Sequence, residues 1–507
     1  MKTFFKSLFT ITFFAFLTKL LSFLLKVFLS REIGAEAIGM IQVASSICMV
    51  FMTLSSSGLN IIVSKKTSEY YNSDKKQKVF SMVTACLILD ILISSISILL
   101  VLCCSSIIKK LTSESIYILL LCMLPCLLSS SISCSLTGYF WGRKNHFANS
   151  FSEFFEQFLR NIFCLILVST APNPVNGAIR VVLSMSVACV ISTILTLLLY
   201  IKVDGKFKKP SKSDFSDLIK SSFPITFVKF INSFTHPVIA IIVPIQLGAM
   251  GFTQSQALSM FGIMQGMTLP LIMLPMMLIS ALNTVLIPDL VSFYTKKRYI
   301  ESQNIINMTI CFSLFITCLI LPIYTSIGKN IGIFLFDNSS CGIYLSKSAW
   351  IMIPCAISGI TSAILNVLNL EKKSSRNFII STFVMLICSI ILPYFLDILS
   401  IPFSMGISMI INSLLNCISI RKNLHFNPKI IPILTKFLLV GIPTHFFTIN
   451  IYGIMNKYFT MFYSLFIGAL IGVIFYVVLC LIFKIINIKV IFAFKNQANQ
   501  LFYNSQN

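Results

Sequence analysis

Charged side chains are scarce in this chain. Asp, Glu, Lys and Arg make up only 11% of its 507 residues, whereas hydrophobic residues make up 56%. In soluble domains roughly a quarter of the residues are charged, so this chain cannot cover its surface with solvated groups. The deficit excludes a water-soluble enzyme, a disordered protein and a nucleic-acid-binding domain. It predicts an all-α polytopic membrane protein.

Acidic residues are scarcer than basic ones. The 16 Asp and Glu stand against 39 Lys and Arg, which gives a formal net charge of +23. This excess does not indicate nucleic acid as a partner, because the basic residues lie in short loops between apolar runs and form no basic domain. Basic loops of this kind are typical of the positive-inside bias of helical membrane proteins.

Several catalytic and metal-binding patterns are also missing. The chain has no GxxxxGK[ST] loop and no HExxH motif, and no segment between apolar runs is longer than about 20 residues. Its four histidines are far apart, and most of its 16 cysteines lie inside apolar runs without the spacing of a zinc site. We therefore expect no metal, no cofactor and no enzymatic activity, which leaves a transporter as the favoured class.

Membrane-spanning helices are predicted from apolar runs of about 20 residues. The sequence contains fourteen such runs, at about 5–29, 38–63, 80–107, 115–137, 149–170, 178–201, 219–243, 256–287, 304–324, 344–368, 378–396, 401–420, 433–450 and 459–483. With the N-terminus in the cytoplasm, 26 Lys and Arg fall on the inner side and 5 on the outer side. This distribution predicts that both termini are cytoplasmic.

The first and seventh runs share a short pattern, which predicts an internal repeat. In both, a Lys is followed seven residues later by another basic or titratable residue, and a Gly-Ala pair marks the outer end. The second copy lies six runs after the first. We therefore expect two six-helix lobes related by pseudo-two-fold symmetry, followed by two further helices. The predicted division is an N-terminal lobe (1–203), a cytoplasmic linker (204–218), a C-terminal lobe (219–420), helices thirteen and fourteen (421–485) and a cytoplasmic tail (486–507).

The same pattern predicts two polar stripes, because residues seven apart lie on one face of a helix. The stripe residues are Lys19, Ser22 and Lys26 in the first run and Lys229, Asn232 and His236 in the seventh. A charge at bilayer depth costs about 2.5–3.5 kcal/mol and usually faces water or the bundle interior. The stripes thus favour a central, wet, cationic cavity that binds substrate. Alternatively, the lysines extend their ammonium groups to the interfaces, and this applies most to Lys26 near the outer end.

Acidic residues within the apolar runs are candidates for ion pairs or for coupling. Glu156 and Arg160 have the i, i+4 spacing of an ion pair, and Glu153 lies on the same face within reach of Arg160. Such a pair is either structural or functional. Asp90 stands alone in the third run. It is either a proton or cation site or the partner of a buried lysine.

Three separated segments resemble a known family. They are Thr18–Ser22 continuing to Gly39, Gly138–Arg143 with Glu156–Arg160 behind it, and Gly262–Pro275 running on to Pro288. They look like segments of the stage V sporulation protein B-like polysaccharide transporters. These belong to the multidrug/oligosaccharidyl-lipid/polysaccharide (MOP) exporter superfamily and are related to lipid II flippases. Ser22 stands where the family often has Gly, and Lys26 where it often has Arg, which loses bidentate phosphate geometry but keeps the charge.

The resemblance implies a flippase in the bacterial plasma membrane. Its cargo would be an undecaprenyl-diphosphate-linked saccharide moved from the inner to the outer leaflet, such as a peptidoglycan precursor for the spore cortex, with the cationic cavity holding the diphosphate. Membrane lipids and the cell-wall synthesis machinery are the other expected partners. The alternatives are a drug or cation antiporter of the MATE type, an exporter of teichoic or capsular polysaccharide units, and a scaffold that does not transport.

Overall fold

The computed structural model describes residues 2–73, 75–168, 173–424, 426 and 428–485. Nearly all of these residues are helical, and no strand occurs among them. The predicted cytoplasmic tail, 486–507, lies outside the described residues. The chain forms two compact units, Met1–Gly266 and Met267–Asn507, which we call unit 1 and unit 2.

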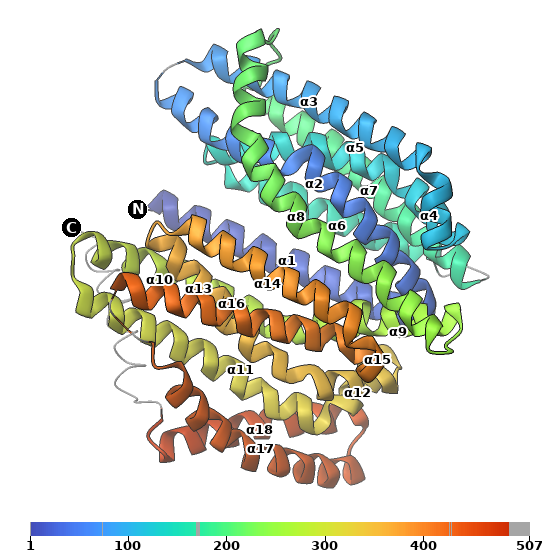
Figure 1. The fold of residues 1–507 in the computed structure, drawn as a ribbon, viewed down its shortest axis with the longest axis vertical. Coiled ribbons are helices and arrows are strands. Elements are labelled where there is room, and N and C mark those ends of the chain that lie inside the picture. Colours follow the sequence, from blue (N-terminus) through green and yellow to red (C-terminus); the bar gives the residue numbers. More distant parts are fainter. Residues whose placement is uncertain (1, 74, 169–172, 425, 427, 486–507) are drawn as a thin grey trace. The chain divides into compact units, whose positions relative to one another are not determined.

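Unit 1 is built around α2, which contacts α1, α3, α5, α7, α8 and α9. In Figure 1, α3, α5 and α7 lie alongside one another, and α3 packs on α5 as α5 does on α7. The helices of unit 1 are α1 (Lys2–Glu32), α2 (Gly34–Asn72), α3 (Lys76–Cys103), α4 (Ser105–Leu111), α5 (Glu114–Gly142), α6 (His146–Val168), α7 (Pro174–Lys202), α8 (Lys212–Ala249) and α9 (Gln254–Gly262).

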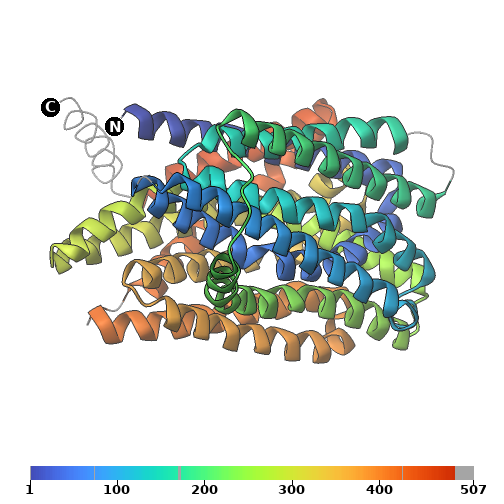
Figure 2. The same cartoon turned by 90° about the horizontal axis from the view of Figure 1, so that it is seen from above.

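In unit 2, α11 contacts α10, α12, α13, α17 and α18. The helices are α10 (Leu269–Thr295), α11 (Tyr299–Phe336), α12 (Ser339–Ser348), α13 (Met352–Val367), α14 (Glu371–Ile391), α15 (Pro393–Leu396), α16 (Ser400–Leu424), α17 (Ile430–Tyr458) and α18 (Met461–Ile482), with the 3-10 turns η2 (Ala349–Ile351) and η3 (Asp397–Leu399). The π-helical segment η1 (Ile263–Thr268) leads from α9 to α10. Within each unit the long helices run roughly side by side (Figures 1 and 2).

The prediction of an all-α polytopic membrane protein is confirmed. Thirteen helical segments of the described residues are long and apolar enough to cross a membrane. The predicted number of fourteen is approximate, because the run 149–170 corresponds to α6, which is not among the thirteen. α6 carries three charged residues, Glu153, Glu156 and Arg160, within a helix of 23 residues. A further difference concerns the predicted linker 204–218, since α8 already begins at Lys212.

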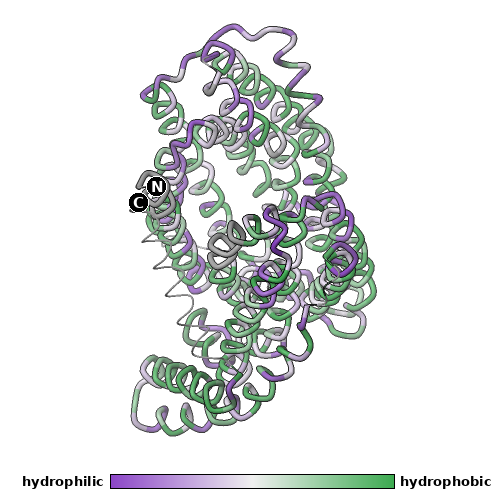
Figure 3. The backbone as a smooth tube through the Cα atoms, turned by 90° about the vertical axis from the view of Figure 1, so that its left-hand side faces the viewer, coloured by the Kyte–Doolittle hydropathy of each residue, from purple (hydrophilic) through white to green (hydrophobic). Residues whose placement is uncertain are grey.

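The buried side chains include many small polar residues, and many exposed ones are large and apolar. Most of the tube in Figure 3 has hydrophobic colours. Inside unit 1, the hydroxyl oxygens of Ser55 and Ser131 lie 2.6 Å apart. Inside unit 2, Asn377 Nδ2 donates to Asn416 Oδ1 at 3.0 Å. Phe223, by contrast, is 65% exposed. This inversion of the soluble pattern is expected where lipid is the solvent, because helices there associate through small and polar residues.

Two glycines explain the Gly138–Arg143 segment noted in the sequence. A Cβ atom on Gly138 would lie 2.6 Å from the carbonyl oxygen of Asn60, and one on Gly142 would lie 2.6 Å from that of Ser64. Their spacing of four places both on the side of α5 that faces α2. The absence of side chains at these positions therefore allows the two backbones to come into contact.

Arg143 joins three helices at this end of unit 1. Its guanidinium donates to the Tyr139 hydroxyl at 3.2 Å and to the carbonyl oxygen of Val203, and it lies 4.8 Å from the ring centroid of Tyr71. Tyr139 is fully buried. The segment thus fastens α5 to α2 and to the end of α7, which is a structural role.

We expect Gly142→Ala to destabilise the protein by about 1–3 kcal/mol, the usual range for overpacking a tight contact. The measurement is the midpoint of thermal unfolding in detergent. The matched control is Gly359→Ala in α13, where an added Cβ meets no atom within 4 Å. Because Ala favours a helix over Gly, this control is expected to be neutral or slightly stabilising. Equal midpoints for the two variants would contradict the close contact of α5 with α2.

Candidate functional site

All ten candidate residues named from the sequence lie in unit 1. They are carried by four helices: α1, α3, α6 and α8. The structure therefore allows their surroundings to be compared within a single compact body.

The stripe on α1 is accessible and has no acidic partner among the described residues. Lys19 is exposed, and Ser22 and Lys26 are half-buried. Lys19 and Lys26 lie seven residues apart on the same helix, two turns along one face. No ion pair involves either lysine in the described part of the chain. Two neighbouring ammonium groups without a carboxylate make this face of α1 suited to an anion.

The stripe on α8 has a similar composition but different neighbours. Lys229 and His236 are exposed, and Asn232 is half-buried. Asn232 Oδ1 is buried without a hydrogen-bond partner. α8 packs mainly on α2, whereas α1 packs mainly on α6. The structure thus places both stripes in unit 1 without a described contact that joins them into one cluster.

α6 carries the predicted ion pair. Arg160 donates to Glu156 Oε1 at 2.5 Å, and both side chains are mostly buried, at 21% and 29% exposure. Glu153 accepts a hydrogen bond from Asn149 Nδ2 at 3.0 Å, so its described partner is this amide and not Arg160. Arg160 Nε is buried and unpartnered. The ion pair itself is confirmed, and its role in coupling stays a prediction.

Two amides extend the polar row of α6 towards α1. Gln157 Nε2 donates to Asn161 Oδ1 at 2.9 Å, and Asn161 Nδ2 donates to the carbonyl oxygen of Leu21 at 3.0 Å. This bond reaches the backbone of α1 between Lys19 and Ser22. The polar face of α6 therefore holds the helix that carries the first stripe.

Asp90 lies in the interior of unit 1 and is fully buried. The Ser135 hydroxyl of α5 donates to Asp90 Oδ2, and Asp90 Oδ1 has no hydrogen-bond partner. No ion pair between Asp90 and a lysine occurs among the described residues. The predicted alternative of pairing with a buried lysine is therefore unsupported by the geometry.

Sequence reasoning missed the polar residues around Asp90. Ser135 Oγ lies 2.8 Å from Cys86 Sγ, and Asn60 Nδ2 donates to Cys134 Sγ at 3.3 Å. The signal that could have found them is the segment 129–135, SSSISCS, in which six of seven residues are Ser or Cys within a membrane-spanning run. Such density of small polar side chains indicates an internal helix contact.

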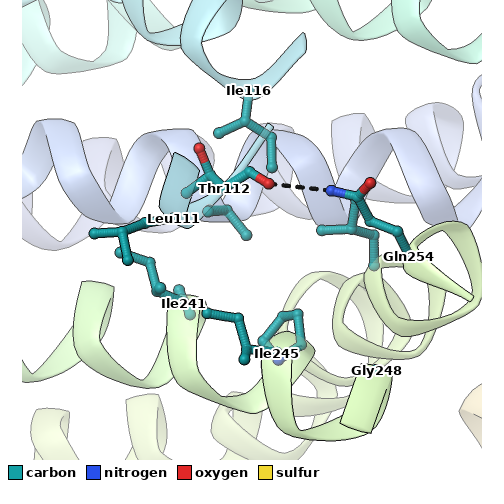
Figure 4. A pocket seen from close by; sticks show the side chains of 11 residues that line it. Leu111, Thr112, Ile116, Ile241, Ile245, Gly248 and Gln254 are labelled. Carbon is teal, nitrogen blue, oxygen red and sulfur yellow. Dashed lines mark hydrogen bonds between the residues drawn. The ribbon is translucent and has the colours of Figure 1, made fainter. Parts of the chain in front are cut away.

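A separate cavity of about 190 Å³ lies near the turns that join α4 to α5 and α8 to α9. Figure 4 shows Gln254 and Thr112 pointing towards each other, and Gln254 Nε2 donates to the Thr112 carbonyl oxygen at 3.1 Å. The other lining side chains are mostly apolar, such as Ile116 and Ile241. The cavity contains none of the ten candidates. Within the described residues, no group of three or more His, Cys, Asp or Glu side chains is arranged to hold a metal ion.

Comparison with known proteins identifies a family and a related sequence. Residues 4–294 match the family model described as "Polysaccharide biosynthesis protein". Over 444 residues the chain is 24% identical to stage V sporulation protein B of Bacillus subtilis (strain 168), which covers 84% of this chain and 85% of that protein.

Two solved structures have a similar fold. The lipid II flippase MurJ, in an inward closed conformation, has a TM-score of 0.74 at 16% identity, with 93% of this chain and 98% of that chain covered. An inward-facing multidrug resistance transporter of the MATE family and MOP superfamily has a TM-score of 0.69 at 12% identity, covering 80% and 94%. At such low identity, these similarities show the fold alone.

The resemblance predicted from the sequence is confirmed by these matches. The family model matches more than half of this chain, and the chain therefore belongs to the polysaccharide biosynthesis protein family.

Proposed function

We propose that the protein is a flippase that moves an undecaprenyl-diphosphate-linked saccharide from the inner to the outer leaflet of the bacterial plasma membrane. The observation that carries the proposal is the α1 stripe, where Lys19 is exposed, Lys26 is half-buried, and no acidic partner is described for either. The similarity to stage V sporulation protein B and to a lipid II flippase supports a peptidoglycan precursor as the cargo, for the spore cortex.

The chemistry of the cargo fits ammonium groups that lie within the membrane. A lipid diphosphate carries about two negative charges beside a polar saccharide, and neither crosses hydrocarbon without help. A buried cation costs about 2.5–3.5 kcal/mol at bilayer depth, and an approaching anion offsets that cost. The prenyl chain can stay in lipid while Lys19, Lys26 and Lys229 hold the diphosphate.

Transport would follow an alternating-access cycle in which these residues face first the inner and then the outer side. In the proposed topology both termini are cytoplasmic, as the distribution of basic loops predicts. The cell interior is negative, so outward movement of an anion is favoured by about 2.3 kcal/mol per charge per 100 mV. The membrane potential can therefore drive the step without ATP.

A MATE-type antiporter is the second candidate, because a MATE transporter shares the fold. Such a pump needs available carboxylates for cations, whereas Glu156 is neutralised by Arg160 in this chain. Export of teichoic or capsular units would use the same cationic residues with a different saccharide. Assays with each lipid-linked saccharide and with a cationic dye separate these candidates, and a scaffold would transport none of them.

We expect Lys19→Ala to lower the rate of flipping about 10- to 100-fold, because a hydrogen bond to a charged group contributes about 1.5–3 kcal/mol. The measurement is the accessibility of a labelled lipid-linked saccharide in the outer leaflet of proteoliposomes. Lys19→Arg keeps the charge and should retain most activity. The control is Lys436→Ala, which removes an exposed lysine of α17 outside the stripes. Full activity of Lys19→Ala would refute the proposed role of the stripe.

Flipping should also respond to an imposed potential. A potential that is negative on the side where the substrate starts should speed transport, and reversing its sign should slow it, because the cargo is an anion. The potential can be set by potassium diffusion with valinomycin while the same label is followed. Rates that stay constant under both signs would argue against potential-driven transport of an anion.

A further inference from the structure

Asp90 has an unusual environment for an acidic side chain. It lies in α3, has no exposed surface, and receives one described hydrogen bond, from the Ser135 hydroxyl to Oδ2. Oδ1 is buried and has no partner. Ser94 does not supply one, because its hydroxyl donates to the backbone carbonyl of Asp90 at 2.5 Å.

The groups that face Asp90 come from its own helix and from the helices packed on α3, namely α2, α5 and α8. α3 itself contributes the Cys86 thiol, and α5 contributes Ser135 and Cys134. α2 contributes the uncharged Asn60, which donates to Cys134. The charged group on the α8 side is Lys229.

An ionised carboxylate is poorly accommodated here. A buried charge needs a counter-ion and several hydrogen bonds, and without them the group becomes neutral instead. Asp90 has one described donor and no ion pair. Sodium is a poor alternative, because hard cations take about six or more oxygen ligands, whereas the backbone carbonyls of α3 and α5 are engaged in their helices. The neutral, protonated form of the Asp90 carboxyl is therefore favoured, because it removes the uncompensated charge.

Partly exposed side chains lie near the carboxyl. Cys134 and Asn60 are both half-buried, and Cys134 is the neighbour of Ser135 in α5. Asn60 of α2 donates to Cys134 at 3.3 Å. Water would have to enter at this contact to reach Asp90.

We propose that Asp90 is a proton-binding site that is loaded and emptied during the transport cycle. This proposal rests on the function proposed above and adds a coupling ion to it. On release, the O–H bond at Oδ1 breaks, the proton passes to water, and the electron pair stays on the carboxylate, which keeps the Ser135 hydrogen bond. On loading, the reverse occurs.

The first test measures the protonation of the carboxyl directly and needs no transported substrate. Infrared spectra of the protein in lipid should contain a carbonyl band of a protonated carboxyl near neutral pH, and the band should disappear as the pH rises. Asp90→Asn should remove it. The control Asp337→Asn should retain the band, because the band is assigned to Asp90. This control should fold, because Asn also tolerates the positive φ of 52° at position 337. A missing band, or a band unchanged at every pH at which the protein stays folded, would overturn the proposal.

Ser135→Ala provides a second variant if Asp90→Asn does not fold. It removes a donor to the carboxylate, so the band should persist to higher pH than in the unmodified protein. An unchanged pH midpoint would contradict the assignment of the band to Asp90.

The second test measures, in proteoliposomes, whether flipping is coupled to a proton gradient. A pH gradient should change the rate of flipping for the unmodified protein and for Asp337→Asn, and this dependence should be lost in Asp90→Asn. The proposal is overturned if Asp90→Asn keeps the pH dependence. It is also overturned if flipping by the unmodified protein depends on a sodium gradient instead, and Asp90→Asn loses that sodium dependence. If no variant flips the saccharide, the proposed function fails, and the infrared titration still decides whether Asp90 binds a proton.

Discussion

The structure depends on one constraint: within hydrocarbon, every polar atom must find its partner inside the protein. Helices satisfy the backbone, which explains why membrane-spanning segments take this form. The side chains follow the same requirement. Ser133 and Thr193 pair across α5 and α7 at 2.7 Å, and Asn416 Nδ2 donates to Ser362 Oγ at 2.9 Å in unit 2. Small polar residues thus bind the helices together, while large apolar residues face outward.

Several polar residues do not meet this constraint, and candidate site residues are among them. The ammonium groups of Lys19 and Lys26 have no described acidic partner, and one oxygen each of Asp90 and Asn232 is buried without a donor. An unsatisfied polar group in a membrane protein is costly and usually functional. The Gly138–Arg143 segment is different, because its glycines and its arginine are fully used in packing. The Gly138–Arg143 segment therefore has an architectural role.

Much of the fold could be predicted from the sequence, because hydropathy directly reports which segments lipid accepts. Each predicted run corresponds to a helix of the structure, and α6 departs in hydropathy because Glu153, Glu156 and Arg160 lie within it. The ion pair of Glu156 with Arg160 was also predictable, since both residues lie on one helix. The partners of Asp90 and Glu153 were not predictable to the same extent. Ser135 comes from another helix, and the Asn149 amide competes with Arg160 for Glu153.

The charged row of α6 has a consequence for how the protein is made. The cellular machinery that inserts helices during synthesis accepts a segment according to its hydrophobicity, and each central charge opposes acceptance by about 2.5–3.5 kcal/mol. α6 is therefore a poor candidate to enter the bilayer alone. Its partners are α1, synthesised much earlier, and α7, synthesised immediately afterwards. Integration of α6 should thus wait for α7, so that the two helices enter as a hairpin already in contact with the nascent bundle.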